Sequence, residues 1–150
     1  MNAVEVEGAR AVHYEFEITI DAPPDRVWKA LTGQLSSWWL PDFQMLGPDS
    51  VVSLEPTPGG RLYEQRGDSG LLWYTVLAVS PVESLSLAGY CTQDFGGPCS
   101  TLLCLKLKAE GKKTRLRVSD GLFGRVKDEQ ASSLKSGWQR LFSAGVKEHV

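Results

Sequence analysis

The sequence predicts an α+β protein in which a curved antiparallel sheet of about seven strands wraps around a long C-terminal helix. Three observations support this fold class. An alternating strand pattern covers 14–21, short strands and turns follow one another over 50–121, and an amphipathic helical pattern covers about 126–148. Only the last helix is long enough to cover the apolar face of such a sheet, so the two are expected to pack together.

The first elements are a strand and two short helices. The segment Tyr14–Asp21 alternates apolar and polar side chains, which predicts a strand with one buried face. A helix is expected from Pro24, which suits a first helical turn, to about Thr32. A second short helix is expected over 35–40, because Pro41 would end it.

Six further strands are expected in series, separated by turns rich in glycine and proline. The segment 71–80 is apolar on both faces, which indicates a strand that is central or covered on both sides. The expected strands are Val51–Glu55, Arg61–Arg66, Leu71–Ser80, Glu83–Ala88, Thr101–Glu110 and Thr114–Asp120, with a loop at Tyr90–Pro98.

The segment from about Val126 to Glu148 is expected to form a long amphipathic helix. Its apolar residues, among them Leu134, Trp138 and Leu141, recur at helical spacing. No internal repeat or linker interrupts the chain, so a single domain over 1–150 is expected, with its core at about 12–149.

Composition and charge exclude several classes of protein. The chain has 150 residues, of which 42% are hydrophobic and 23% charged, as in ordinary globular domains. The net charge is −2, with −6 over 1–60 and +6 over 101–150, so no nucleic-acid partner is expected and the basic third is either a solvated face or a patch for an acidic partner. No apolar run approaches the roughly 20 residues of a membrane span. The first ten residues lack the apolar core of a signal peptide, so the predicted location is the cytoplasm, with no membrane partner.

The cysteines and histidines predict neither a metal site nor a cofactor. Cys91, Cys99 and Cys104 form no CxxC pair, and the only histidines are His13 and His149. An odd number of cysteines without a signal peptide favours free thiols. A disulfide between Cys91 and Cys99 across a hairpin is the alternative.

Several local motifs accompany this order of elements and carry a family resemblance. They are Pro24–Leu31 after the first strand, Trp38-Trp39, Pro58–Tyr63 at the start of a strand, Gly70 before Leu71–Pro81, and Gly137-Trp138 with Leu141 in the last helix. Over Tyr14–Glu148 the chain resembles the SRPBCC superfamily, also called START-like or helix-grip. Within it, the match is to the branch named after the activator of the heat-shock-protein-90 ATPase. The resemblance implies the helix-grip fold and a hydrophobic cavity between the sheet and the last helix. The chaperone-activating eukaryotic members carry an additional N-terminal domain, so that role is not expected here.

The aromatic side chains are the main candidate binding residues. Five tryptophans in 150 residues is a high content, and an aromatic side chain offers a large apolar face, with an indole N–H that can orient a polar group. Packing of these residues into an ordinary core is the alternative. The expected ligand-binding residues are Trp39, Tyr63, Trp73, Trp138 and Phe142, with Phe43 near the mouth of the cavity.

Polar candidates are fewer. Arg61 and Tyr63 share strand parity; Arg61 is expected in water and Tyr63 buried. Asp120 would face inward with Leu116 and Val118 if the strand continued that far, but it is expected to lie beyond the strand end. The alternative is a buried carboxylate that could serve as an acid. The sequence Gly67–Gly70 has the letters of a serine-nucleophile segment, yet it suits a hairpin turn and no histidine is placed to activate a serine. No catalytic residue is therefore predicted.

The functional hypothesis is binding of a small hydrophobic or amphipathic ligand between the sheet and the C-terminal helix. One alternative, implied by the superfamily, is an enzyme like the polyketide cyclases. It is less favoured because no histidine occupies a position in the expected cavity. The other alternative is a protein-interaction domain associated with a chaperone or with a second copy of the chain, and a homodimer is possible.

Overall fold

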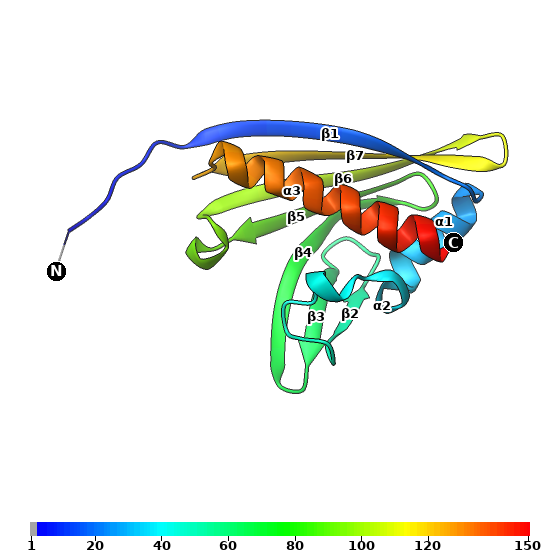
Figure 1. The fold of residues 1–150 in the computed structure, drawn as a ribbon, viewed down its shortest axis with the longest axis horizontal. Coiled ribbons are helices and arrows are strands. Elements are labelled where there is room, and N and C mark those ends of the chain that lie inside the picture. Colours follow the sequence, from blue (N-terminus) through cyan, green and yellow to red (C-terminus); the bar gives the residue numbers. More distant parts are fainter. Residues whose placement is uncertain (1–2) are drawn as a thin grey trace.

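The computed structural model describes residues 3–150 and contains one seven-stranded antiparallel sheet in the order β1-β7-β6-β5-β4-β3-β2. The long helix α3 runs across one face of this sheet, with the short helices α1 and α2 beside its C-terminal end (Figure 1). Both features of the predicted fold class, the curved antiparallel sheet and the C-terminal helix that it holds, are confirmed.

The helices and strands follow the predicted order along the chain. The strands are β1 (Arg10–Ile20), β2 (Val51–Leu54), β3 (Arg61–Arg66), β4 (Ser69–Ser80), β5 (Ser84–Cys91), β6 (Cys99–Glu110) and β7 (Lys113–Gly124). The helices are α1 (Pro24–Gly33), α2 (Leu35–Trp38), α3 (Asp128–Arg140) and α4 (Lys147–His149), with short 3₁₀ turns η1 (Pro41–Phe43) and η2 (Gln93–Phe95) and a π-helical segment η3 (Leu141–Val146).

Five strands are longer than the sequence pattern indicates, and in β5, β6 and β7 the extra residues lie close to the candidate site. β5 continues to Cys91, β6 begins at Cys99, and these two residues pair across the sheet. β7 continues past Asp120 to Gly124 because β1 and β6 both pair with it along its whole length. The expectation that Asp120 lies beyond the strand end is therefore wrong.

The outer face of the sheet is open to solvent. Leu77 of β4 and Leu102 of β6 are both 54% exposed, because α3 covers only the opposite face. Of the two alternatives for the segment 71–80, the central strand is correct, since β4 pairs with both β5 and β3, and coverage on both sides is wrong. Elsewhere on this face polar pairs bridge neighbouring strands, as with Arg117 Nη2, which lies 2.7 Å from Glu15 Oε2.

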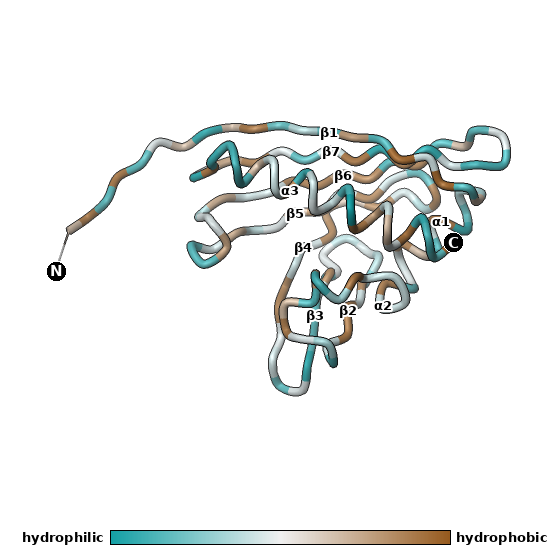
Figure 2. Tube along the Cα trace, in the orientation of Figure 1, coloured by the Kyte–Doolittle hydropathy of each residue, from teal (hydrophilic) through white to brown (hydrophobic). Residues whose placement is uncertain are grey.

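The inner face carries the core. Alternate residues of β1, β6 and β7 point toward α3, and hydrophobic and hydrophilic positions alternate along these strands in Figure 2. The last helix is long, as expected, and runs without a break from Asp128 to His149, with a π-helical segment at Leu141–Val146. At Gly145 any side chain would meet the Trp38 carbonyl oxygen at 2.6 Å, so glycine is needed where this turn meets α2.

Among residues 3–150, no helix combines the length and the apolar character needed to cross a bilayer.

Candidate functional site

The sheet divides where β4 leaves β5. β4 pairs with β5 only from Thr75 onward, while its first half, Ser69–Tyr74, pairs with β3 and bends away with it (Figure 1). A register shift between β3 and β4 leaves Trp73 as the extra residue of a bulge. At Gly89 of β5, a side chain would meet the Tyr74 ring at 2.8 Å, so glycine lets this ring lie against β5. Trp73 and Tyr74 are thereby directed into the space beneath α3.

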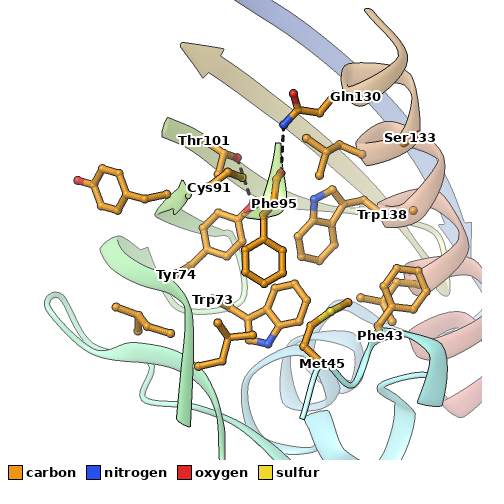
Figure 3. A pocket seen from close by; sticks show the side chains of 16 residues that line it. Phe43, Met45, Trp73, Tyr74, Cys91, Phe95, Thr101, Gln130, Ser133 and Trp138 are labelled. Atoms are coloured by element: carbon orange, nitrogen blue, oxygen red, sulfur yellow. Dashed lines mark hydrogen bonds between the residues drawn. The ribbon is translucent and has the colours of Figure 1, made fainter. Parts of the chain in front are cut away.

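A cavity of about 350 Å³ lies at this division, between the sheet and α3 (Figure 3). This volume is at the small end of the range for ligand pockets in proteins. Sixteen residues line the cavity, and six of them are aromatic. They are Phe43, Met45, Leu71, Leu72, Trp73, Tyr74, Tyr90, Cys91, Phe95, Thr101, Gln130, Ser133, Leu134, Gly137, Trp138 and Leu141.

Trp138 is the centre of an aromatic cluster behind the cavity. Its ring stacks on Phe142 at 5.6 Å between centroids and lies 5.9 Å from Tyr74. Trp39 contacts Trp138 and Trp73 edge-on, at 6.4 Å and 5.3 Å. These rings lie at the offset and edge-to-face geometries that aromatic pairs favour, so they form one packed wall of the cavity.

The six residues expected to bind a ligand lie in three different places. Phe43, Trp73 and Trp138 line the cavity. Trp39 and Phe142 are buried behind that wall, around a second space of about 20 Å³ that has room for a single water molecule.

Tyr63 lies apart from the other five. It is half-buried on the outer face of β3, where the Arg61 guanidinium lies 4.2 Å above its ring. The expectation that Tyr63 is buried is wrong, because Leu62 and Glu64 take the inward positions of this strand. The expectation that Arg61 is exposed is confirmed.

A chain of hydrogen bonds forms the inner end of the cavity. The Asp120 carboxylate, 1% exposed, accepts from the Thr101 hydroxyl at 2.6 Å and from the Tyr14 hydroxyl at 2.7 Å. The Tyr74 and Thr101 hydroxyls lie 3.1 Å apart, and both residues line the cavity. Both oxygens of Asp120 therefore act as hydrogen-bond acceptors.

Burial and this carboxylate change the acidity of neighbouring groups. Burial, followed by the charge of Asp120, raises the pKa of the Tyr14 phenol. Burial also raises the pKa of Tyr74; its contacts with Thr101 and Trp138 offset only part of this effect. Both tyrosines therefore remain neutral hydrogen-bond donors in the folded protein.

Glu64 is a second buried carboxylate, with no exposed surface, on β3. Burial alone would raise the pKa of this carboxyl, but the hydrogen bonds it accepts outweigh burial and lower the pKa. The donors are the Leu46 N–H at 2.7 Å, the Met45 N–H at 3.1 Å, the Ser50 hydroxyl at 2.7 Å and the Trp73 indole at 3.1 Å. Glu64 therefore connects the loop after η1, which carries Met45, to the Trp73 side of the cavity.

The cysteines beside the cavity are free thiols. Cys91 and Cys99 are cross-strand partners in β5 and β6, and Cys91 lines the cavity. Burial, followed by the neighbouring Cys99, raises the pKa of the Cys91 thiol. The thiol is therefore protonated at neutral pH and is a poor nucleophile.

Sequence reasoning missed much of the cavity lining. The sequence pattern predicts a loop for both Tyr90 and Phe95. In the structure Tyr90 lies in β5, and Phe95 lies in η2, where its carbonyl accepts from the Gln130 side chain of α3 at 3.4 Å (Figure 3). The parity of Asp120 and of Glu64 did carry a signal, since each alternates with buried apolar residues along its strand.

A comparison with protein-family models decides the family. The model described as "Activator of Hsp90 ATPase homolog 1-like protein" matches residues 21–150. The chain belongs to this family. The resemblance of the sequence to the SRPBCC superfamily and to this branch of it is thereby confirmed. A search of curated protein sequences finds no significant relative.

Solved structures share the fold. Protein MLL2253 from Mesorhizobium loti is 23% identical, with 93% of this chain and 95% of that chain covered at a TM-score of 0.63. DynU16, a putative protein in the dynemicin biosynthetic locus, is 23% identical at a TM-score of 0.65, with 88% of this chain and 45% of that chain covered. Ara h 8.0201 is 17% identical at a TM-score of 0.64, with 93% and 97% covered. Identities this low are evidence for the fold alone.

Proposed function

We propose that this protein binds a small apolar or amphipathic molecule in the cavity beneath α3. The observation that carries the proposal is the cavity itself. A space of about 350 Å³ stays open beside a core in which the remaining aromatic side chains pack against one another. An apolar hollow with a few polar groups at one end is the usual form of a small-molecule site.

The composition of the walls supports an aromatic or cyclic ligand. Trp73 and Trp138 offer flat faces on two sides, and Leu134 and Leu141 of the last helix add apolar area. A flat ligand between such walls would bury most of its surface without requiring rearrangement of the clustered rings.

Fluorescence titration tests the proposal directly. N-phenyl-naphthylamine, a neutral probe that becomes fluorescent in apolar surroundings, is expected to bind with saturation at one site per chain. Because Trp73 and Trp138 line the cavity, tryptophan emission should change over the same concentration range. An absence of saturable binding by this probe and by a panel of neutral aromatic compounds would contradict the proposal.

A matched pair of variants on α3 locates the site. Ser133 is exposed and lines the cavity, whereas its neighbour Ser132 is exposed and does not. Ser133→Phe should block the mouth and weaken binding of the probe by about tenfold or more, a loss of roughly 1.4 kcal/mol. Ser132→Phe adds the same side chain one position away and should leave the affinity unchanged. Equal effects of the two changes would place the bound probe elsewhere.

One observation favours a second candidate function, acid–base catalysis on a bound carbonyl compound. Asp120 is a buried carboxylate that two hydroxyls, those of Thr101 and Tyr74, connect to the cavity. Such a chain can move a proton to or from a ligand. The test is exchange of the α-protons of β-tetralone with deuterated water, followed by mass spectrometry. Catalysed exchange that Tyr74→Phe abolishes would support catalysis, and a rate equal to that of buffer would exclude this reaction.

A further inference from the structure

The inner end of the cavity presents hydrogen-bond acceptors, and this restricts the ligand, provided that the cavity binds one as proposed. The hydroxyl proton of Thr101 is committed to Asp120, at an O···O distance of 2.6 Å. The Tyr74 hydroxyl, 3.1 Å from Thr101, must then donate its own proton to the Thr101 oxygen. A hydroxyl has one proton and two lone pairs, so what remains for a ligand at this end is lone pairs.

The charge distribution around the cavity also disfavours an anionic ligand. Among the described residues 3–150, none of the sixteen lining side chains is charged. Asp120 places a negative charge behind the Thr101 and Tyr74 hydroxyls, and both of these residues are only 4% exposed. An anion entering this end would lose its hydration without meeting a cation and would face a carboxylate of the same sign.

We infer that the ligand is an apolar cyclic molecule that carries a hydrogen-bond donor, a hydroxyl or an amine, and no negative charge, and that it enters with this donor directed toward Tyr74 and Thr101. Organic acids, including fatty acids, are excluded by the same arrangement. The walls of Trp73 and Trp138 hold the ring system, and the acceptors at the inner end select the substituent.

Three probes of one shape test this inference by calorimetry. They are naphthol, methoxynaphthalene and naphthoate, substituted at the same ring position. Naphthol offers a donor, its methyl ether offers only an acceptor, and naphthoate is an anion. Naphthol is expected to bind about tenfold more tightly than the ether, the value of one hydrogen bond, and naphthoate more weakly than either. Equal affinities, or tightest binding of naphthoate, would overturn the inference while the proposed function stands. Binding of none of the three would remove both.

Two variants test whether Asp120 and Tyr74 cause the preference for naphthol over its methyl ether. Asp120→Asn keeps the shape of the side chain and removes its charge, so the preference for naphthol over its ether should fall toward unity and naphthoate should gain affinity. Tyr74→Phe removes only the terminal hydroxyl and is expected to reduce the same preference. It remains decisive if the Asp120 variant does not fold.

The matched control is Tyr63→Phe. Tyr63 lies on the outer face of β3 and does not line the cavity, so loss of its hydroxyl should not change the preference. An undiminished preference in folded Tyr74→Phe, or an equal loss in Tyr63→Phe, would overturn the assignment.

Discussion

Glu64 and Asp120 are both fully buried carboxylates on the inner face of the sheet, yet their surroundings differ. Glu64 accepts hydrogen bonds from two backbone N–H groups, a hydroxyl and an indole. Asp120 accepts only from the hydroxyls of Tyr14 and Thr101. Glu64 thereby fixes a loop and one wall of the cavity, whereas Asp120 polarises hydroxyl groups at the inner end of the cavity. A buried charge can thus serve structure in one place and recognition in another.

The largest effect is expected from removing Glu64. Glu64→Ala leaves the N–H groups of Met45 and Leu46 and the indole of Trp73 without their acceptor. Each unsatisfied buried donor is costly, so the free energy of unfolding should fall by about 3 kcal/mol or more. Urea unfolding followed by circular dichroism measures this change. Binding of N-phenyl-naphthylamine should also weaken, because Met45 and Trp73 line the cavity.

The neighbouring position supplies the control for this change. Gln65 follows Glu64 on β3 and is exposed, so Gln65→Ala should alter the free energy of unfolding by less than about 0.5 kcal/mol. A similarly small effect of Glu64→Ala would show that water replaces the carboxylate and that the loop does not depend on it.

A smaller loss of stability is expected at Asp120. In Asp120→Asn the amide oxygen still accepts from one hydroxyl, and the amide N–H can donate to the other after that hydroxyl turns. The loss should be about 1 to 2 kcal/mol, the difference between hydrogen bonds to a charged and to a neutral group. Urea unfolding measures it, with Ser119→Ala, one residue earlier on the outer face, as the control. A loss as large as that of Glu64→Ala would mean that the two carboxylates serve the same structural purpose.

The free energy of unfolding should depend on Glu64 at acidic pH and on Tyr14 and Tyr74, which lie around Asp120, at alkaline pH. Because the pKa of Glu64 is lowered from its ordinary 4.5, its contribution is complete above that pH and is lost as the pH falls through the lower folded value. The pKa values of Tyr14 and Tyr74 are raised from 10, so their contribution is complete below pH 10 and is lost as the pH rises toward the higher folded values.

Urea midpoints measured across pH can detect both limits. Glu64→Gln should reduce the fall of the urea midpoint at acidic pH only. Tyr14→Phe should reduce its fall at alkaline pH only. If Glu64→Gln left the acid side as steep as in the parent protein, other carboxyl groups would have to be responsible for the loss of stability there.

Much of the fold was predictable because it rests on periodicity. The alternation over 14–20 and 101–109 places the buried residues of β1 and β6 correctly. Asp120 was misplaced because the pattern after Val118 contains polar and small residues, and only the pairing of β7 with β1 and β6 keeps the chain extended there. Strand ends are decided by partners distant in sequence, which a local pattern does not contain.

The candidate site was less predictable than the fold for a related reason. Trp39 and Trp73 are equally plausible cavity residues in the sequence; in the structure their rings are in contact, at 5.3 Å between centroids, yet only Trp73 lines the cavity. What opens the cavity is the bulge at Trp73 and the departure of β4 from β5, and neither has a residue signature of its own. Hydrophobic patterning can identify the buried face of a strand or helix, but it cannot show where the sheet and the helix leave a cavity between them.

The smallest effect is expected at an exposed carboxylate, which completes the comparison. Glu15 lies on the outer face of β1, 2.7 Å from the Arg117 guanidinium; hydrogen bonding to this group and its charge lower the Glu15 pKa. Water solvates both partners, so the ion pair adds little that solvent does not already provide. Glu15→Gln should leave the urea midpoint unchanged at physiological salt, although its pKa shift has the same direction as that of Glu64. A marked loss of stability would contradict this prediction and would mean that the direction of the pKa shift is enough to identify a stabilising carboxylate. An unchanged midpoint would mean that burial and the number of hydrogen bonds accepted set the contribution of the carboxylate to stability.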